Sequence, residues 1–184
     1  MKRLLSMQPI RLACLAACLA PGLATGQAST EVVEAKSVLA ADGAYPGSSL
    51  QAAVVAQVAP GYHINDNKPT LDYLIATELK FDAMKPLRVE KIAYPKGEAK
   101  RFAFSDTPLS VYEGTVVIAA LLKVAPAVRL GTYTVKGKLV YQACNDHACL
   151  PPASAPFTLT VRVVRRGAPV KRENADIFHR VQFD

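Results

Sequence analysis

Apolar and polar residues alternate with a period of two along much of this chain, and this pattern restricts its fold more than any other feature. The pattern is clearest over 50–58, where Gln51 and Gln57 share one parity and the other parity is apolar. It recurs over 130–142 and over 157–164. Because successive side chains of a strand point to opposite faces, we predict that each segment is a strand with one solvated face.

Further segments complete the predicted fold. Residues 115–124 form an almost continuous apolar run between Gly114 and Pro126, which is typical of a central buried strand. Turn-forming residues separate three weaker strand patterns, at 31–41, 74–81 and 86–94. About seven strands at this spacing predict an all-β fold, an immunoglobulin-like antiparallel β-sandwich.

Composition is consistent with a globular domain. Apolar residues make up 51% of the 184 residues and charged residues 20%, which disfavours a disordered chain. With 13 Pro and 10 Gly, a long helical bundle is not expected. After the N-terminal segment no apolar run reaches 18 residues, so we predict no transmembrane segment in the mature chain.

The N-terminal segment 1–28 has the features of a signal peptide. Three bases and no acid precede the apolar stretch 12–24, and small residues allow cleavage after Ala28 or Gly26. A buried N-terminal helix is the alternative, which the Pro-Gly pair at 21–22 disfavours. We therefore expect an exported protein.

A second processing route is open. Leu15-Ala16-Ala17-Cys18 resembles the lipobox of bacterial lipoproteins, and its use would place a lipid anchor on Cys18. Only six residues separate Arg11 from Cys18, which is short for an apolar region, so we favour ordinary cleavage. Both routes place the domain in an oxidising space outside the cytoplasm.

Removal of the leader also lowers the net charge. The formal charge is +7, and taking the three leader bases from the 22 in the chain leaves 19 bases against 15 acids, or +4. Much of this excess lies near the C-terminus, where segment 165–184 loses the alternation. We predict no nucleic-acid partner, one domain over 29–164, and a charged tail over 165–184 that carries a short helix or is simply solvated.

The mature domain keeps two cysteines, Cys144 and Cys149, which we expect to pair in an oxidising compartment. They lie where the chain leaves one predicted strand and enters the next, and the loop they close is only six residues long. Closing so short a loop stabilises a domain little. Such a bridge suits reversible exchange, although the spacing alone leaves a purely structural disulfide equally open.

Other polar residues give weaker hypotheses. Cys144, His147 and Cys149 could hold a soft metal ion, but nothing in the sequence brings His63 or His179 close to them, and we predict neither a metal nor a cofactor. His147 could instead modulate the thiols when protonated.

Two loop motifs have structural interpretations. We interpret His63 as a hydrogen-bonded loop anchor in a Gly-Tyr-His-Ile turn. Asn65-Asp66-Asn67 resembles half of a calcium-binding loop, but Asx turns explain it with fewer assumptions.

Several blocks of the sequence occur in the same order as in a known family. The cysteine segment reads Tyr-Gln-Ala-Cys at 141–144 and Cys-Leu-Pro-Pro at 149–152. It resembles the redox-active segment of the N-terminal periplasmic domain of DsbD, the thiol:disulfide interchange protein. The resemblance spans about residues 31–164 and includes further blocks at 60–69, 72–79, 94–97 and 111–114.

The resemblance implies an immunoglobulin-like fold in the periplasm and a function for the cysteine pair. A membrane-embedded thiol reductase would reduce Cys144 and Cys149, which would pass the electrons to periplasmic thioredoxin-like proteins. Cys149 would form the mixed disulfide with the downstream partner and Cys144 would resolve it. The protein would then be an electron carrier rather than a small-molecule enzyme.

The same family covers its cysteine pair with a cap loop, and the counterpart here is 100–105. The resemblance implies that Phe102 or Phe104 shields the sulfurs until a partner docks. The sequence departs from DsbD in two respects. Lys100 and Arg101 of the cap loop stand where DsbD has acids, and four residues separate the two cysteines where DsbD has five.

The chain carries neither the membrane domain nor the thioredoxin-like domain of DsbD, so we expect a stand-alone exported protein. The alternative is an immunoglobulin-like binding module with a purely structural disulfide, since this fold hosts many unrelated functions.

Overall fold

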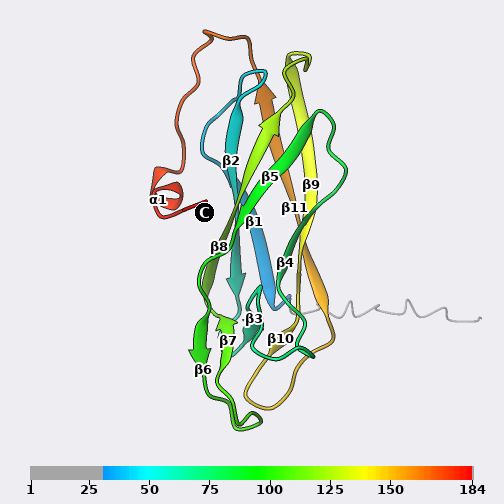
Figure 1. Cartoon of the computed structure of the whole chain (residues 1–184), viewed down its shortest axis with the longest axis vertical. Coiled ribbons are helices and arrows are strands. Elements are labelled where there is room, and N and C mark those ends of the chain that lie inside the picture. Colours follow the sequence, from blue (N-terminus) through cyan, green and yellow to red (C-terminus); the bar gives the residue numbers. More distant parts are fainter. Residues whose placement is uncertain (1–30, 184) are drawn as a thin grey trace, which may run out of the picture. The chain divides into compact units, whose positions relative to one another are not determined.

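The computed structural model describes residues 31–183, which fold as a two-layer β-sandwich (Figure 1). One antiparallel sheet has the strand order β1-β2-β8-β5 and the other has the order β11-β9-β4. This is the order of an immunoglobulin constant-type domain, in which the first, second, fifth and fourth strands form one sheet. The prediction of an all-β, immunoglobulin-like antiparallel sandwich is therefore confirmed. The strands are β1 (Val33–Leu39), β2 (Ser49–Val58), β4 (Glu78–Phe81), β5 (Leu87–Ala93), β8 (Thr115–Val124), β9 (Gly131–Tyr141) and β11 (Ala153–Val163).

Each of the seven predicted segments overlaps one of these strands, although β11 begins at Ala153, before the predicted 157–164. The run predicted as a central buried strand is β8, which lies between β2 and β5. In β11 every second residue from Ala155 to Val163 is buried and the residues between them are exposed, as the alternation predicts. The inward faces of the two sheets form one apolar core, whose largest fully buried side chains include Ile118, Leu122 and Leu139.

Three connections leave the sandwich at the same end and form a second, smaller sheet there. The strand order of this end sheet is β10-β3-β7-β6, and it lies at the lower end of Figure 1. Its strands are β3 (His63–Asn65), β6 (Glu98–Lys100), β7 (Leu109–Tyr112) and β10 (Ala143–Cys144). None of these four strands was predicted, because two to four residues are too few to display a period of two.

A buried carboxylate ties the loops of the end sheet together. Asp66 Oδ2 accepts a hydrogen bond from Ser110 Oγ (2.6 Å) and Asp66 Oδ1 accepts one from the backbone N–H of Lys68 (2.7 Å). The second bond is an Asx turn, as predicted for this motif. A Cβ added at Gly97 would lie 2.4 Å from Asp66 Oδ2, so the chain must have glycine there.

The C-terminal segment folds back onto the sandwich and is not a solvated tail. It carries the predicted short helix, α1 (Ala175–Phe178), which lies beside β2 and β8 (Figure 1). Phe178 is only 9% exposed and belongs to one apolar cluster with Ala53 and Ala119, which are register partners in β2 and β8. The small alanine side chains leave room for this ring, and the apolar residues of the tail cover a sheet face that would otherwise be exposed.

The predicted signal peptide 1–28 and the lipobox with Cys18 lie outside the described residues. Within residues 31–183 no helix is long and apolar enough to cross a membrane.

We predict that Phe178→Ala lowers the free energy of unfolding by about 3 kcal/mol, at the low end of the range for buried Phe→Ala substitutions. Urea denaturation followed by circular dichroism measures this change. Gln182→Ala, on the exposed side of the same segment, is the control and should leave stability unchanged. Equal stabilities of the two variants would show that the segment does not contribute to the folded domain.

Candidate redox site

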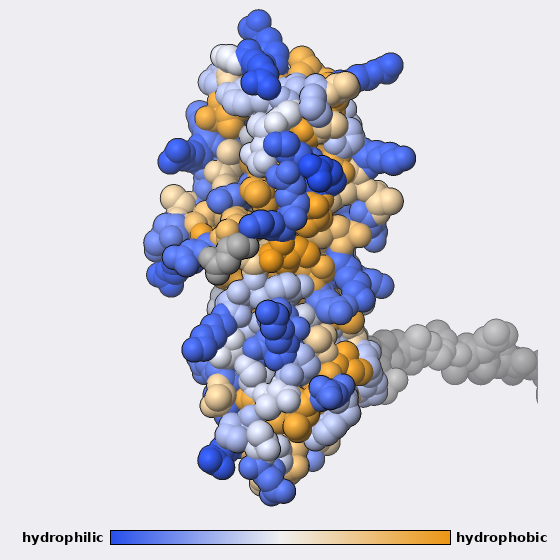
Figure 2. All heavy atoms as spheres, viewed as in Figure 1, coloured by the Kyte–Doolittle hydropathy of each residue, from blue (hydrophilic) through white to orange (hydrophobic). Residues whose placement is uncertain are grey.

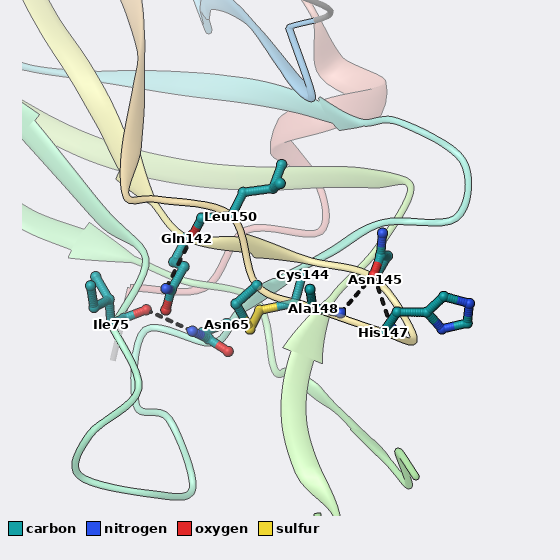
Figure 3. The surroundings of a disulfide bond; sticks show 9 residues. Asn65, Ile75, Gln142, Cys144, Asn145, His147, Ala148 and Leu150 are labelled. Atoms are coloured by element: carbon teal, nitrogen blue, oxygen red, sulfur yellow. Dashed lines mark hydrogen bonds between the residues drawn. A yellow bond between two sulfur atoms is a disulfide. The ribbon is translucent and has the colours of Figure 1, made fainter. Parts of the chain in front are cut away.

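Cys144 and Cys149 form a disulfide at the edge of the end sheet (Figure 3). Cys144 ends β10, and the two cysteines are antiparallel bridge partners with Cα atoms 3.9 Å apart. The side chain of Asn145 shapes the turn between them, since its Oδ1 accepts hydrogen bonds from the backbone N–H groups of His147 and Ala148 (both 2.9 Å). The expected pairing of the two cysteines is thus present in the structure.

The two segments that flank this turn are hydrogen-bonded to each other. The backbone N–H of Leu150 donates to the carbonyl of Ala143 (2.8 Å), and Gln142 Nε2 donates to the carbonyl of Leu150 (3.2 Å). These bonds fix the chain on both sides of the cysteines. The position of the turn therefore depends on these hydrogen bonds as well as on the disulfide.

The two cysteines differ in their exposure to solvent. Cys144 is 1% exposed, whereas Cys149 belongs to the exposed residues of the turn. Thiol–disulfide exchange requires direct contact between the attacking thiolate and a sulfur atom. An outside reactant therefore has access to the Cys149 side of the bridge.

His63 lies against the buried cysteine. It is the register partner of Cys144 across the β10–β3 pair and is 2% exposed. Its Nε2 atom is buried and has no hydrogen-bond partner, so the hydrogen-bonded anchor that we expected is absent at this atom. Burial lowers the pKa of His63, and the charges of Glu113 and Asp146 partly offset this effect.

The predicted cap residues reach the site through His63. The Phe102 ring stacks on His63 with ring centroids 4.2 Å apart, and Phe104 stacks on Phe102 at 5.3 Å. Phe102 is half-buried, while Phe104 is 48% exposed. Lys100, one of the two residues that depart from DsbD, forms an ion pair with Glu113 and so joins β6 to the end of β7. That these rings shield the sulfurs stays a prediction.

The rings of the other two histidines, His147 and His179, do not lie against the sulfur atoms. His147 lies in the exposed turn, and its ring points away from the sulfur atoms (Figure 3). His179 follows α1 in the C-terminal segment. Within residues 31–183 no group of three or more His, Cys, Asp and Glu side chains is arranged to hold a metal ion. The modulating role of His147 stays a prediction.

Sequence reasoning missed one further residue near the site. Asn65 is 1% exposed and follows His63 by two residues, so both side chains lie on one face of β3. Its Nδ2 donates to the carbonyl of Ile75 (3.0 Å), whereas its Oδ1 is buried without a partner. The sequence block 60–69 contains both residues, but only the strand pairing places them beside Cys144.

Fold and site together define a class of protein. This class is an immunoglobulin-like sandwich whose end sheet presents a disulfide with a short loop, one cysteine buried and the other exposed.

The comparison with protein families agrees with this class. Residues 31–160 match the family described as thiol:disulfide interchange protein DsbD, N-terminal, and the chain belongs to this family. The resemblance noted in the sequence is thereby confirmed. The comparison with curated proteins found no match.

Solved structures similar to the chain include the following three. The N-terminal periplasmic domain of ScsB from Proteus mirabilis shares 14% identity (TM-score 0.43; 71% of this chain and 44% of that chain covered). The DsbD N-terminal domain in a complex with the PilB N-terminal domain, from Neisseria meningitidis, shares 22% (TM-score 0.39; 66% and 80%). The seventh ScaB type I cohesin from Pseudobacteroides cellulosolvens shares 14% (TM-score 0.44; 77% and 98%). The chain thus spans less than half of the ScsB structure.

We predict that Phe102→Ala speeds reduction of the disulfide by dithiothreitol, because an apolar lid excludes the attacking thiolate. Phe104→Ala should have a smaller effect, since Phe104 contacts Phe102 and is half exposed. Stopped-flow reduction under pseudo-first-order conditions measures both rates. Wild-type rates in both variants would show that the loop does not act as a cap.

Proposed function

We propose that the protein is a periplasmic carrier of electrons that passes them by thiol:disulfide interchange. The observation that supports this function most directly is the asymmetry of the disulfide, with Cys144 buried and Cys149 exposed. An exchanging pair needs one sulfur that partners can reach and one that is kept for the internal step. Membership of the DsbD N-terminal family supports the same chemistry.

The domain does not depend on this disulfide for its fold. The core between the two sheets comprises 25 buried apolar residues, and the cysteine turn has its own backbone hydrogen bonds. Closing a six-residue loop contributes only about 2 kcal/mol in the chain-entropy account. The domain can therefore remain folded while the pair is reduced, which a carrier must do in each cycle.

In the proposed cycle the reduced pair gives two electrons to an oxidised partner. The Cys149 thiolate attacks the disulfide of the partner, and one partner sulfur leaves as a thiolate. Cys144 then attacks Cys149, the mixed disulfide breaks, and the partner is released as a dithiol. A membrane-embedded thiol reductase would return the pair to the dithiol by the reverse sequence of bond changes.

The surface around the site suits a protein partner. Among residues 31–183 four large apolar side chains are exposed, and three of them lie in loops at the cysteine end, namely Tyr73, Ile75 and Phe104. Figure 2 shows apolar atoms among polar ones at this lower end of the molecule. We propose a thioredoxin-like protein as the partner. The complex of a DsbD N-terminal domain with the PilB N-terminal domain from Neisseria meningitidis supports a protein partner for this chain.

The proposed compartment rests on the sequence and on the relatives. The segment 1–28 has the features of a signal peptide. The related ScsB domain from Proteus mirabilis is described as periplasmic. An oxidising compartment also allows a disulfide to persist between turnovers.

We predict that Cys144→Ala accumulates a mixed disulfide through Cys149 with an oxidised thioredoxin-like protein, because the resolving thiol is missing. Cys149→Ala should accumulate little, since its remaining thiol is buried. Non-reducing gel electrophoresis and mass spectrometry identify the linked cysteines. The reverse trapping pattern would contradict the assignment of the two cysteines. Absence of any mixed disulfide in both variants would favour a binding module with a structural bridge.

A further inference from the structure

We propose that His63 is the general base that takes the proton from the Cys144 thiol when this cysteine resolves the mixed disulfide. The inference rests on the proposed function, since it assigns a role in one of its steps. It gives a chemical task to a buried histidine to which the sequence analysis assigned only a structural one.

The strand pairing sets His63 beside Cys144. The two residues are direct partners in the antiparallel β10–β3 pair, so their side chains project from the same face. Side chains so paired have Cβ atoms about 4.5–5.5 Å apart, which is within reach of a proton transfer between an imidazole and a thiol. Phe102 stacks on the imidazole ring of His63, with ring centroids 4.2 Å apart, and so restrains its orientation.

Two buried polar atoms near Cys144 lack hydrogen-bond partners while the disulfide is formed. The thiol proton that Cys144 carries only in the reduced protein would give them one. Buried polar atoms in proteins nearly always have hydrogen-bond partners. Here His63 Nε2 and Asn65 Oδ1 have none, and both residues lie on the face of β3 that Cys144 shares. A disulfide sulfur carries no hydrogen, whereas a thiol does. Reduction of the bridge therefore supplies a donor beside two unoccupied acceptors.

The resolving step needs a local base because Cys144 is buried. Burial disfavours a free thiolate and keeps bulk water from accepting the proton. Burial also favours the neutral form of His63, which is the form that can accept a proton. The two effects act together, since one opposes spontaneous ionisation of the thiol and the other keeps the base available.

The resolving step moves one proton to His63 and two electrons to the partner. The Cys144 thiol gives its proton to His63 Nε2, and its sulfur attacks the Cys149 sulfur. The Cys144–Cys149 bond forms while the bond from Cys149 to the partner sulfur breaks, and the partner leaves as a thiolate. The chain has then lost two electrons and the partner has gained them. The imidazolium returns its proton to the leaving thiolate or to solvent.

Three charged groups influence the protonation of His63. Glu113 and Asp146 favour the imidazolium, and Lys100 opposes it. Because only neutral His63 accepts the proton, the resolving step slows when the pH falls below the pKa of this histidine. Without His63 the rate should follow the free thiolate of Cys144 and rise steadily with pH.

The experiment uses the reduced full-length mature protein and 5,5′-dithiobis(2-nitrobenzoate). The first thionitrobenzoate is released when a cysteine forms the mixed disulfide, at a rate proportional to reagent concentration. The second is released by the internal attack, at a rate independent of that concentration. His63→Phe keeps an aromatic ring to stack on Phe102 but removes the base, and His179→Ala, at an exposed position of the C-terminal segment, is the control histidine outside the site.

We expect His63→Phe to slow the second release about 100-fold at pH 7 and to leave the first release unchanged. The rate of the second release should change slope at the pKa of His63 in the wild type, and this change of slope should be absent in His63→Phe. His179→Ala should match the wild type in both phases. A wild-type second phase and pH profile in His63→Phe would overturn the inference while leaving the proposed function intact. If the wild type itself shows no second release, the cysteine pair does not re-form and the proposed function fails. Circular dichroism of the oxidised variants checks that each is folded, and His63→Gln serves as a second base-free variant.

Discussion

Apolar side chains that alternate inward from β2, β8, β9 and β11 hold the two sandwich sheets together, and the position of the cysteine pair depends on this contact. The buried faces fix the ends of these strands relative to one another. The three connections between them consequently leave the sandwich at one end, where they pair as the end sheet. The strand pairs β10–β3, β3–β7 and β6–β7 then place Cys144, His63 and the start of the cap loop in one sheet. The candidate redox site is in this way positioned by a rigid scaffold.

The sandwich stabilises the domain and the end sheet carries the proposed chemistry. This division follows from the sizes of the two parts. The sandwich buries enough apolar surface to fold without help from the cysteines, so the bridge is free to open and close. The end sheet is small and polar atoms lie within it unpaired, which a purely structural element would avoid. The buried Cys144 and the exposed Cys149 have different environments only because the end sheet covers one of them. The proposed chemistry therefore depends on the part of the domain that contributes least to its stability.

The sequence was sufficient for the sandwich and for the pairing of the cysteines, but not for the residues around them. Strands such as β9 and β11 are long enough for their alternation to appear, and Cys144 and Cys149 are the only cysteines after residue 30, so each has only the other as a partner there. His63 and Asn65 lie on a three-residue strand, too short for a pattern, and their position beside Cys144 arises from long-range pairing. The docking of the C-terminal segment was missed for a related reason. Ala53 and Ala119 are small residues whose burial on the outer face becomes visible only when Phe178 is placed above them.

The reduction potential of the Cys144–Cys149 bridge decides whether this bridge can exchange in function. Equilibration of the protein with dithiothreitol redox buffers, followed by alkylation and mass spectrometry, gives the fraction reduced at each potential. A carrier must be able both to gain and to lose electrons, so we predict a potential above about −300 mV. A value well below about −300 mV, in the range of structural disulfides, would contradict the account.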